Sequence, residues 1–179
     1  FWGSGVAGGG RWRLNRVRGM AERVQRVAVI DIGSNSTRLL VADVEDGLVT
    51  PVERRSTVTR LGRGVDLSGQ LAAEAIEAAC AAVDPYVATL QEMGAEKVDA
   101  IATSAVRDAT NGSAFVAELR ERFALGARVL DGEEEARLTY IGATSETAPE
   151  VPTLVVDIGG GSTELIVGEG REIEWHVSL

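Results

Sequence analysis

Two short segments of the chain share residues that can bind phosphate and a metal ion. Residues 29–41 read VIDIGSNSTRLLV and residues 155–167 read VVDIGGGSTELIV, so eight of thirteen positions are identical at a constant offset of 126 residues. Each copy places an aspartate, Asp31 or Asp157, after an apolar run and before a turn of small residues. Such turns expose several backbone N–H groups, which can surround phosphate oxygens.

The two aspartates need a further component if these turns bind phosphate. A carboxylate alone repels phosphate, whereas a hydrated divalent cation binds both groups. We therefore predict that Asp31 and Asp157 face each other across one cleft and hold Mg²⁺ or another divalent cation. Ordinary hairpin turns also favour Asp, Gly, Asn and Ser, but two matched copies weaken that explanation. The phosphate-binding candidates in the turns are Ser34, Asn35, Ser36, Gly159, Gly160, Gly161 and Ser162.

Hydrophobic patterning predicts the same strand arrangement around both turns. In the first copy we expect an antiparallel meander of the strands Val27–Ile30, Thr37–Asp43 and Val49–Leu61. In the second copy we expect the strands Thr153–Asp157, Ser162–Val167 and Glu172–Val177.

Helices alternate with short strands between the two copies. Apolar residues at spacings of three and four predict a helix over Leu71–Met93, which Pro85 should kink or divide. A second helix should be capped by Asn111 and run to Phe123. With strands at Val98–Thr103 and Ala127–Leu130, the first copy should form a mixed five-stranded sheet covered by helices.

A third helix is predicted from Glu133 to Ser145, with Leu138, Ile141 and Gly142 on one face. The polar stretch Thr144–Pro152 follows as a linker. We therefore expect a first domain over residues 20–146 and the start of a second, similar domain over residues 147–179. The chain ends inside a strand meander, so we expect an N-terminal fragment. Residues 1–19 are rich in Gly and Arg, and we expect a disordered tail or upstream translation before Met20.

Composition excludes several classes of protein. The net charge of −9 argues against binding nucleic acid or an anionic membrane through bulk attraction, and no apolar run is long enough to span a bilayer. The lone cysteine, Cys80, lies on an apolar helical stripe and fits a reducing, cytoplasmic compartment. The lone histidine, His176, is an ordinary strand residue without nearby metal ligands. The sequence leaves the oligomeric state open, with a homodimer among the options.

Four motifs, in order, resemble the exopolyphosphatase and guanosine pentaphosphate phosphohydrolase (Ppx/GppA) family of the actin-like ATPase superfamily. They are AVIDIGSNSTRLLV at residues 28–41, ATSAVRDATN at 102–111, GEEEARL at 132–138 and DIGGGSTEL at 157–165. The resemblance implies an α/β fold of the actin-like ATPase (ribonuclease H-like) type, a mixed sheet with flanking helices. It also implies Mg²⁺-assisted hydrolysis of terminal phosphate from inorganic polyphosphate or guanosine pentaphosphate.

The same resemblance implies roles for single residues. Glu135 becomes the general base, for which we expect a carboxylate at the cleft edge that is not paired with an arginine. The internal repeat, independently of the resemblance, assigns Glu164 to the water or metal side, since the first copy has Arg38 at the matching position. Arg107 becomes a fork that holds phosphate oxygens. Arg54, Arg55, Arg60 and Arg63 form either a solvated strand face or a surface that steers a polyanion.

Two alternatives remain from the sequence. An ATP-dependent kinase or ATPase of the same fold would share both turns but would add an adenosine pocket. A nucleotide-binding or filament-forming protein without catalysis would keep the turns and lack a placed base. The GEEEARL segment favours the phosphohydrolase, and the sequence does not choose between its two substrates.

Overall fold

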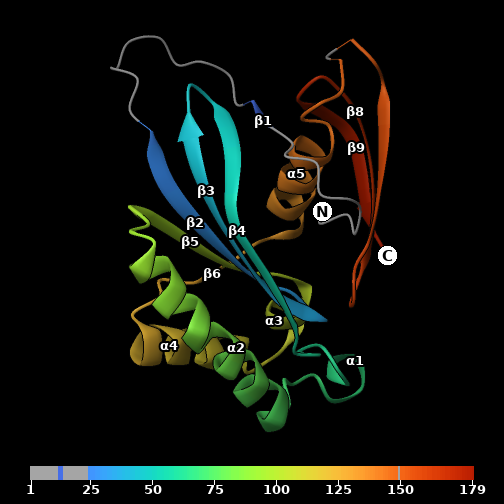
Figure 1. Cartoon of the computed structure of the whole chain (residues 1–179). Helices are drawn as coiled ribbons and strands as arrows, with labels where there is room; N and C mark the ends of the chain where they lie inside the picture. The colour runs from blue at the N-terminus through green and yellow to red at the C-terminus, as the bar shows by residue number, and fades with distance from the viewer. Residues whose placement is uncertain (1–11, 14–23, 149) are drawn as a thin grey trace.

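The computed structural model describes residues 12–13, 24–148 and 150–179, and their strands form two separate sheets (Figure 1). Sheet A has six strands in the order β1-β4-β3-β2-β5-β6, and sheet B has three in the order β7-β8-β9. The strands are β1 Trp12–Arg13, β2 Gln25–Ile32, β3 Ser36–Glu45, β4 Leu48–Val58, β5 Lys97–Ala102, β6 Arg128–Val129, β7 Thr153–Ile158, β8 Thr163–Glu169 and β9 Glu172–Ser178. The helices are α1 Val65–Ser68, α2 Ala73–Glu92, α3 Ser104–Asp108, α4 Gly112–Phe123 and α5 Gly132–Ala143.

Sheet A is mixed, as the patterning predicts. Strands β2, β3 and β4 form the antiparallel meander, and β5 and β6 extend the sheet from β2 in parallel. The strand β1 adds a sixth member beside β4, within the segment we expect to be disordered. The other residues of 1–19 lie outside the described part of the chain.

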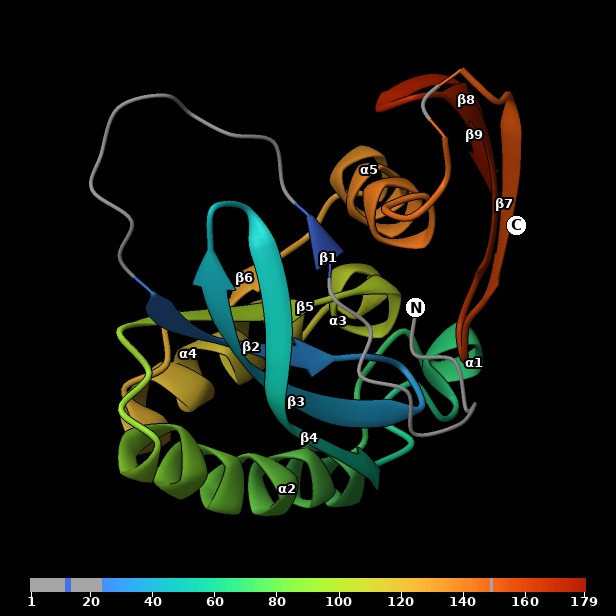
Figure 2. The same cartoon turned by 45° about the horizontal axis from the view of Figure 1, so that its top comes forward.

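Alternation along β2 and β3 decides which side chains reach the core and which reach the site. Successive side chains of a strand point to opposite faces. Ile30, Ile32 and Leu39 are fully buried, on the face that α2 and α4 cover (Figure 2). Asp31 and Arg38 are therefore carried on the opposite face, which looks toward α5 and sheet B (Figure 1).

The long helix α2 is not divided at Pro85, contrary to one of the two outcomes predicted for it. The helix continues from Ala73 to Glu92 with the proline inside it. A proline removes one backbone hydrogen bond and crowds the preceding turn. Burial of Cys80, Val83 and other apolar residues of α2 in the main core favours the helix and offsets that cost.

Asn111 occupies the N-cap position of α4, but its side chain does not cap the helix. Its Oδ1 accepts a hydrogen bond from the Leu71 backbone N–H at 2.8 Å, and its Nδ2 donates to the Leu71 carbonyl at 3.0 Å. The expected cap is wrong because a long-range pair of hydrogen bonds uses the same side chain. Asn111 thus ties the start of α4 to the segment before α2.

The helix α5, unlike α4, begins with a side-chain N-cap. The Asp131 side chain accepts a hydrogen bond from the Glu134 backbone N–H at 2.7 Å. The face of α5 that packs carries Ala136 and Tyr140, which meet Val155 and Ile166 of sheet B. Leu138, on the face that the sequence analysis names, is 41% exposed and lies outside this contact. The first turn of α5, with its glutamates, is thereby held beside both sheets (Figure 1).

Sheet B is covered on one face only in the described part of the chain. Val155 and Ile166 are buried against α5. On the other face Leu154, Val156 and Ile158 are exposed. Among the described helices, none is long and apolar enough to cross a membrane.

Candidate active site

The two matched turns close with the same backbone hydrogen bond. The N–H of Gly33 donates to the carbonyl of Ser36 at 3.1 Å, and the N–H of Gly159 donates to the carbonyl of Ser162 at 2.9 Å. The two bonds are separated by the 126-residue offset of the repeat. Similar sequence therefore produces the same local backbone geometry twice.

Both turns line one pocket of about 530 Å³. All the predicted site residues line it except Arg107 and Gly161: they are Asp31, Ser34, Asn35, Ser36, Glu135, Asp157, Gly159, Gly160, Ser162 and Glu164. The repeat predicts that the two aspartates share a cleft, and the structure confirms this placement. The walls between the polar groups are apolar and include Leu130 and Leu138.

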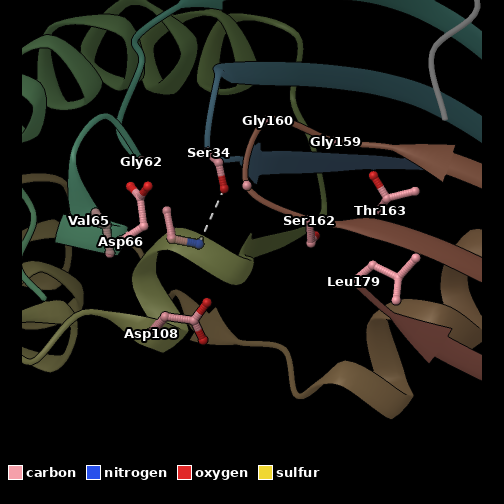
Figure 3. Close-up of a pocket in the computed structure, with 12 residues that line it drawn as sticks. Ser34, Gly62, Val65, Asp66, Asp108, Gly159, Gly160, Ser162, Thr163 and Leu179 are labelled. Carbon is pink, nitrogen blue, oxygen red and sulfur yellow. Dashed lines mark hydrogen bonds between the residues drawn. The ribbon is translucent and has the colours of Figure 1, made fainter.

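The turns also touch each other directly. A Cβ atom added at Gly160 would lie 2.7 Å from Asn35 Cβ, and one added at Gly161 would lie 2.8 Å from Ser34 Oγ. Real Cβ atoms do not approach other atoms this closely, so only glycine permits the contact. Figure 3 shows the second turn beside Ser34; both line a further pocket of about 600 Å³, which Asp66 and Asp108 also line.

Ser34 is held by Ser104, a residue that the sequence analysis did not single out. Its Oγ lies 2.9 Å from Ser104 Oγ, and it accepts a hydrogen bond from the Ala105 N–H at 3.3 Å (Figure 3). Both serines are buried. Ser104 stands three residues before Arg107 in the ATSAVRDATN motif, and this proximity was the available signal. The start of α3 therefore fixes the first turn.

Asp31 is partly shielded from water in this pocket. Burial raises the pKa of Asp31, the Arg38 guanidinium lowers it, and the negative charge of Asp157 raises it again. Arg38 is the direct cross-strand neighbour of Asp31, with Nη1 3.8 Å from Oδ2. The electrostatic effect of Asp157 on Asp31 agrees with their placement in one cleft.

Glu135 lies near both turns but is paired with an arginine, contrary to our expectation. Arg107 Nη1 donates to Glu135 Oε2 at 2.6 Å and also to the Leu130 carbonyl at 3.1 Å. Burial raises the pKa of Glu135, Arg107 lowers it, and the charges of Glu164 and Asp31 raise it further. A half-buried carboxylate without compensation is costly, so the nearest cation pairs with it. By contrast, Glu134 pairs with Arg128 at 2.6 Å on the surface.

Glu164 is buried at the edge of the second turn. It is 5% exposed, and its Oε1 accepts a hydrogen bond from Ser178 Oγ at 3.1 Å. Its direct cross-strand neighbour on β7 is Asp157, another carboxylate. Like charges opposite each other destabilise a sheet unless a cation or hydrogen bonds compensate. The second turn therefore combines two acids where the first turn combines an acid and an arginine.

The carboxylate oxygens of the pocket fit a hard divalent cation, although the protein alone does not supply all of its ligands. In the described part of the chain no group of three or more His, Cys, Asp or Glu residues is arranged as a metal site. Mg²⁺ is commonly held by one or two carboxylates, with water and phosphate oxygens as its remaining ligands. Asp31 and Asp157, in a pocket with backbone N–H groups for phosphate, match that pattern.

These turns on two such sheets define a protein of the α/β actin-like ATPase fold. The chain belongs to the Ppx/GppA phosphatase family, whose family model matches residues 40–179. It is 43% identical over 154 residues to "Exopolyphosphatase 2" of Mycobacterium tuberculosis, a match that covers 80% of this chain and 48% of that protein. The chain thus spans about half the length of the curated relatives that it matches.

Solved structures agree with this assignment. The Aquifex aeolicus member of the Ppx/GppA family is 36% identical with a TM-score of 0.77, over 88% of this chain and 51% of that one. An exopolyphosphatase from Cytophaga hutchinsonii is 32% identical with a TM-score of 0.80, over 87% and 50%. The ethanolamine utilization protein EutJ of Carboxydothermus hydrogenoformans, 19% identical with a TM-score of 0.51, shares the fold alone.

Proposed function

We propose that this chain supplies the phosphate-binding turns and the general base of an exopolyphosphatase. The observation that carries the proposal is the position of Glu135, a half-buried carboxylate with a raised pKa, in one pocket with both matched turns. Family membership and the similarity to a protein named exopolyphosphatase support the same activity. The buried Cys80 thiol, which is not in a disulfide, fits a reducing compartment such as the cytoplasm.

The backbone N–H groups and hydroxyls of the two turns would bind the substrate. They would surround the terminal phosphate group of the substrate. Asp31 and Asp157 would hold Mg²⁺ or another divalent cation, with Glu164 beside it. When bound, the cation would neutralise charge on the phosphate oxygens. The tight contact between Gly160 and Asn35 must widen for a phosphate group to enter between the turns.

Glu135 would accept a proton from the water that attacks the terminal phosphorus. The bond from that phosphorus to the bridging oxygen then breaks, the shortened chain leaves with the bridging oxygen, and orthophosphate is released. Arg107 must first leave the Glu135 carboxylate, and the incoming phosphate oxygens give its guanidinium an alternative partner. The exchange would free the base only when substrate is present.

The test is phosphate release by the whole protein from long-chain polyphosphate, guanosine pentaphosphate and ATP, each with and without Mg²⁺. We expect cation-dependent release of orthophosphate, fastest from polyphosphate. A preference for guanosine pentaphosphate would reassign the substrate within the same mechanism. Turnover of ATP alone, or nucleotide binding without turnover, would contradict the proposal and favour a kinase-like, ATPase or structural role.

A further inference from the structure

A separate pocket of about 490 Å³ lies beside the segment that joins β4 to α1. Its lining consists of Thr59, Arg60, Arg63, Gly64, Ala72, Glu74 and Ala75. Both arginine side chains are exposed. This pocket shares no lining residue with the cleft that holds Glu135.

The two arginines of this pocket differ from six other arginines of the described residues. Six arginines are in ion pairs with carboxylates: Arg26, Arg38, Arg55, Arg107, Arg122 and Arg128. Arg60 and Arg63 make no ion pair within the described residues, although Glu74 lines the same pocket. Their guanidinium donors are therefore available to an anion. Two such groups in one concave site can bind phosphate oxygens in forked geometry.

The segment that carries these arginines is attached directly to the first phosphate turn. The backbone N–H groups of Thr59 and Arg60 donate to the Asn35 carbonyl at 3.0 and 2.9 Å, and that of Gly62 donates to the Ser34 carbonyl at 2.8 Å. Arg60 takes a left-handed backbone conformation, with φ of 52°. That conformation is uncommon for a residue with a side chain, and here it is accompanied by the bond to Asn35. The arginines thus have a fixed position relative to the cleft.

We propose that Arg60 and Arg63 form a second anion subsite, which binds phosphate groups of the substrate that lie outside the cleft. The inference rests on the proposed function. A net charge of −9 repels a polyanion at long range, so local uncommitted cations are needed to hold its distal part. The ligand is a phosphate group, which either a long polyphosphate chain or the far end of guanosine pentaphosphate could provide.

The experiment compares ligands of different length on the whole protein. Affinity is measured calorimetrically for tripolyphosphate, long-chain polyphosphate and guanosine pentaphosphate, with the wild type and the double variant Arg60→Gln/Arg63→Gln. We expect the affinity for long-chain polyphosphate to fall about tenfold, because two charge-assisted contacts are lost. Tripolyphosphate, which is short enough to stay in the cleft, should bind unchanged. A loss for guanosine pentaphosphate as well would identify both sources as ligands of the subsite.

A matched control removes the same charge elsewhere. The double variant Arg120→Gln/Arg171→Gln changes one exposed arginine on α4 and one in the β8–β9 turn. Equal losses in both double variants, or a loss that does not depend on ligand length, would overturn the subsite. The single variant Arg63→Gln leaves the left-handed residue untouched and gives the same comparison if the double variant does not fold. A wild type that binds long-chain polyphosphate no tighter than tripolyphosphate overturns the subsite alone, whereas one that binds no phosphate ligand overturns the proposed function too.

Discussion

The β2–β3 hairpin and the β7–β8 hairpin have matching sequences but different surroundings. Ile32 at the end of β2 is fully buried, whereas its counterpart Ile158 at the end of β7 is 78% exposed. The difference comes from the helices, because α2 and α4 cover that face of sheet A (Figure 2). Local sequence therefore determines the turn and the strand direction, and the neighbouring elements determine what each apolar residue contributes to stability.

The two hairpins also differ in the charge beside the matched aspartate. Asp31 has Arg38 as its cross-strand neighbour, and Asp157 has Glu164. The first carboxylate is partly neutralised by the protein itself. The second has another carboxylate beside it, so a bound cation gains more there. We infer that the second hairpin makes the larger contribution to holding a divalent ion.

The largest expected effect concerns Glu135, the proposed base, which lines one pocket with both hairpin turns. Glu135→Gln keeps the shape of the side chain and removes the proton acceptor, so phosphate release by the whole protein should fall about 10²–10⁴-fold. Steady-state phosphate release measures this. Glu134→Gln is the matched control, since Glu134 pairs with Arg128 outside the pocket, and it should change the rate little. Near-normal rates for both variants would remove Glu135 from the mechanism.

The next prediction compares how much one apolar side chain of each hairpin contributes to the free energy of unfolding. Ile32→Ala should lower the free energy of unfolding by about 2–5 kcal/mol, because it leaves a cavity in a packed core. Ile158→Ala should change it by less than about 0.5 kcal/mol in this chain, because the side chain is already exposed. Urea unfolding followed by circular dichroism measures both. Equal costs would show that the second hairpin is covered in solution.

A third prediction concerns the pH dependence of phosphate release. Glu135 must be ionised to accept a proton, so the rate should fall as pH drops through its raised pKa. Arg107 lowers that pKa in the ligand-free protein, so Arg107→Gln should move the acidic limb of the kcat/KM profile, which reports the ligand-free protein, to higher pH as well as weaken phosphate binding. Arg128→Gln, whose partners are Asp99 and Glu134, should leave the limb in place. An unmoved limb in the Arg107 variant would disconnect this ion pair from the base.

The smallest expected effects come from two buried tyrosines, one packed against each hairpin. Tyr86 Oη donates to the Thr37 carbonyl at 3.2 Å and lies 2.8 Å from Thr57 Oγ1. The Tyr140 hydroxyl is buried without a hydrogen-bond partner among the described residues. Tyr86→Phe should therefore cost about 1 kcal/mol, and Tyr140→Phe should be neutral or slightly stabilising. Thermal unfolding distinguishes them, and a comparable loss for Tyr140→Phe would reveal a partner for its hydroxyl.

Sequence patterning was most reliable where it depended on local alternation. The meander β2–β3–β4, the strand β5 and the two aspartate turns follow from apolar runs that end in small polar residues. The sequence did not predict the short helices α1 and α3, because a single helical turn has too few residues to show a hydrophobic period. Pro85 failed to divide α2 because buried side chains on both sides of it favour a continuous helix.

The sequence predicted which residues lie in the site, but it did not predict which of them form hydrogen bonds or ion pairs with each other. The repeat brings Asp31 and Asp157 into one prediction because their identity is visible in the sequence. The pair Arg107–Glu135 joins residues 28 positions apart, and the bonds between Asn111 and Leu71 join residues 40 apart. Such contacts depend on how helices dock, which the spacing of residues along the chain does not encode.

The hydrogen bond that closes each turn also explains how the two copies keep one backbone geometry with different side chains. Its donor and acceptor are backbone groups, at Gly33 and Ser36 or at Gly159 and Ser162, so mutation of the two residues between them leaves the turn intact. The two turns are complementary: the Ser34 and Asn35 side chains occupy the space that Gly161 and Gly160 leave open. The side chains that one turn can carry are therefore limited by the space that the other turn leaves.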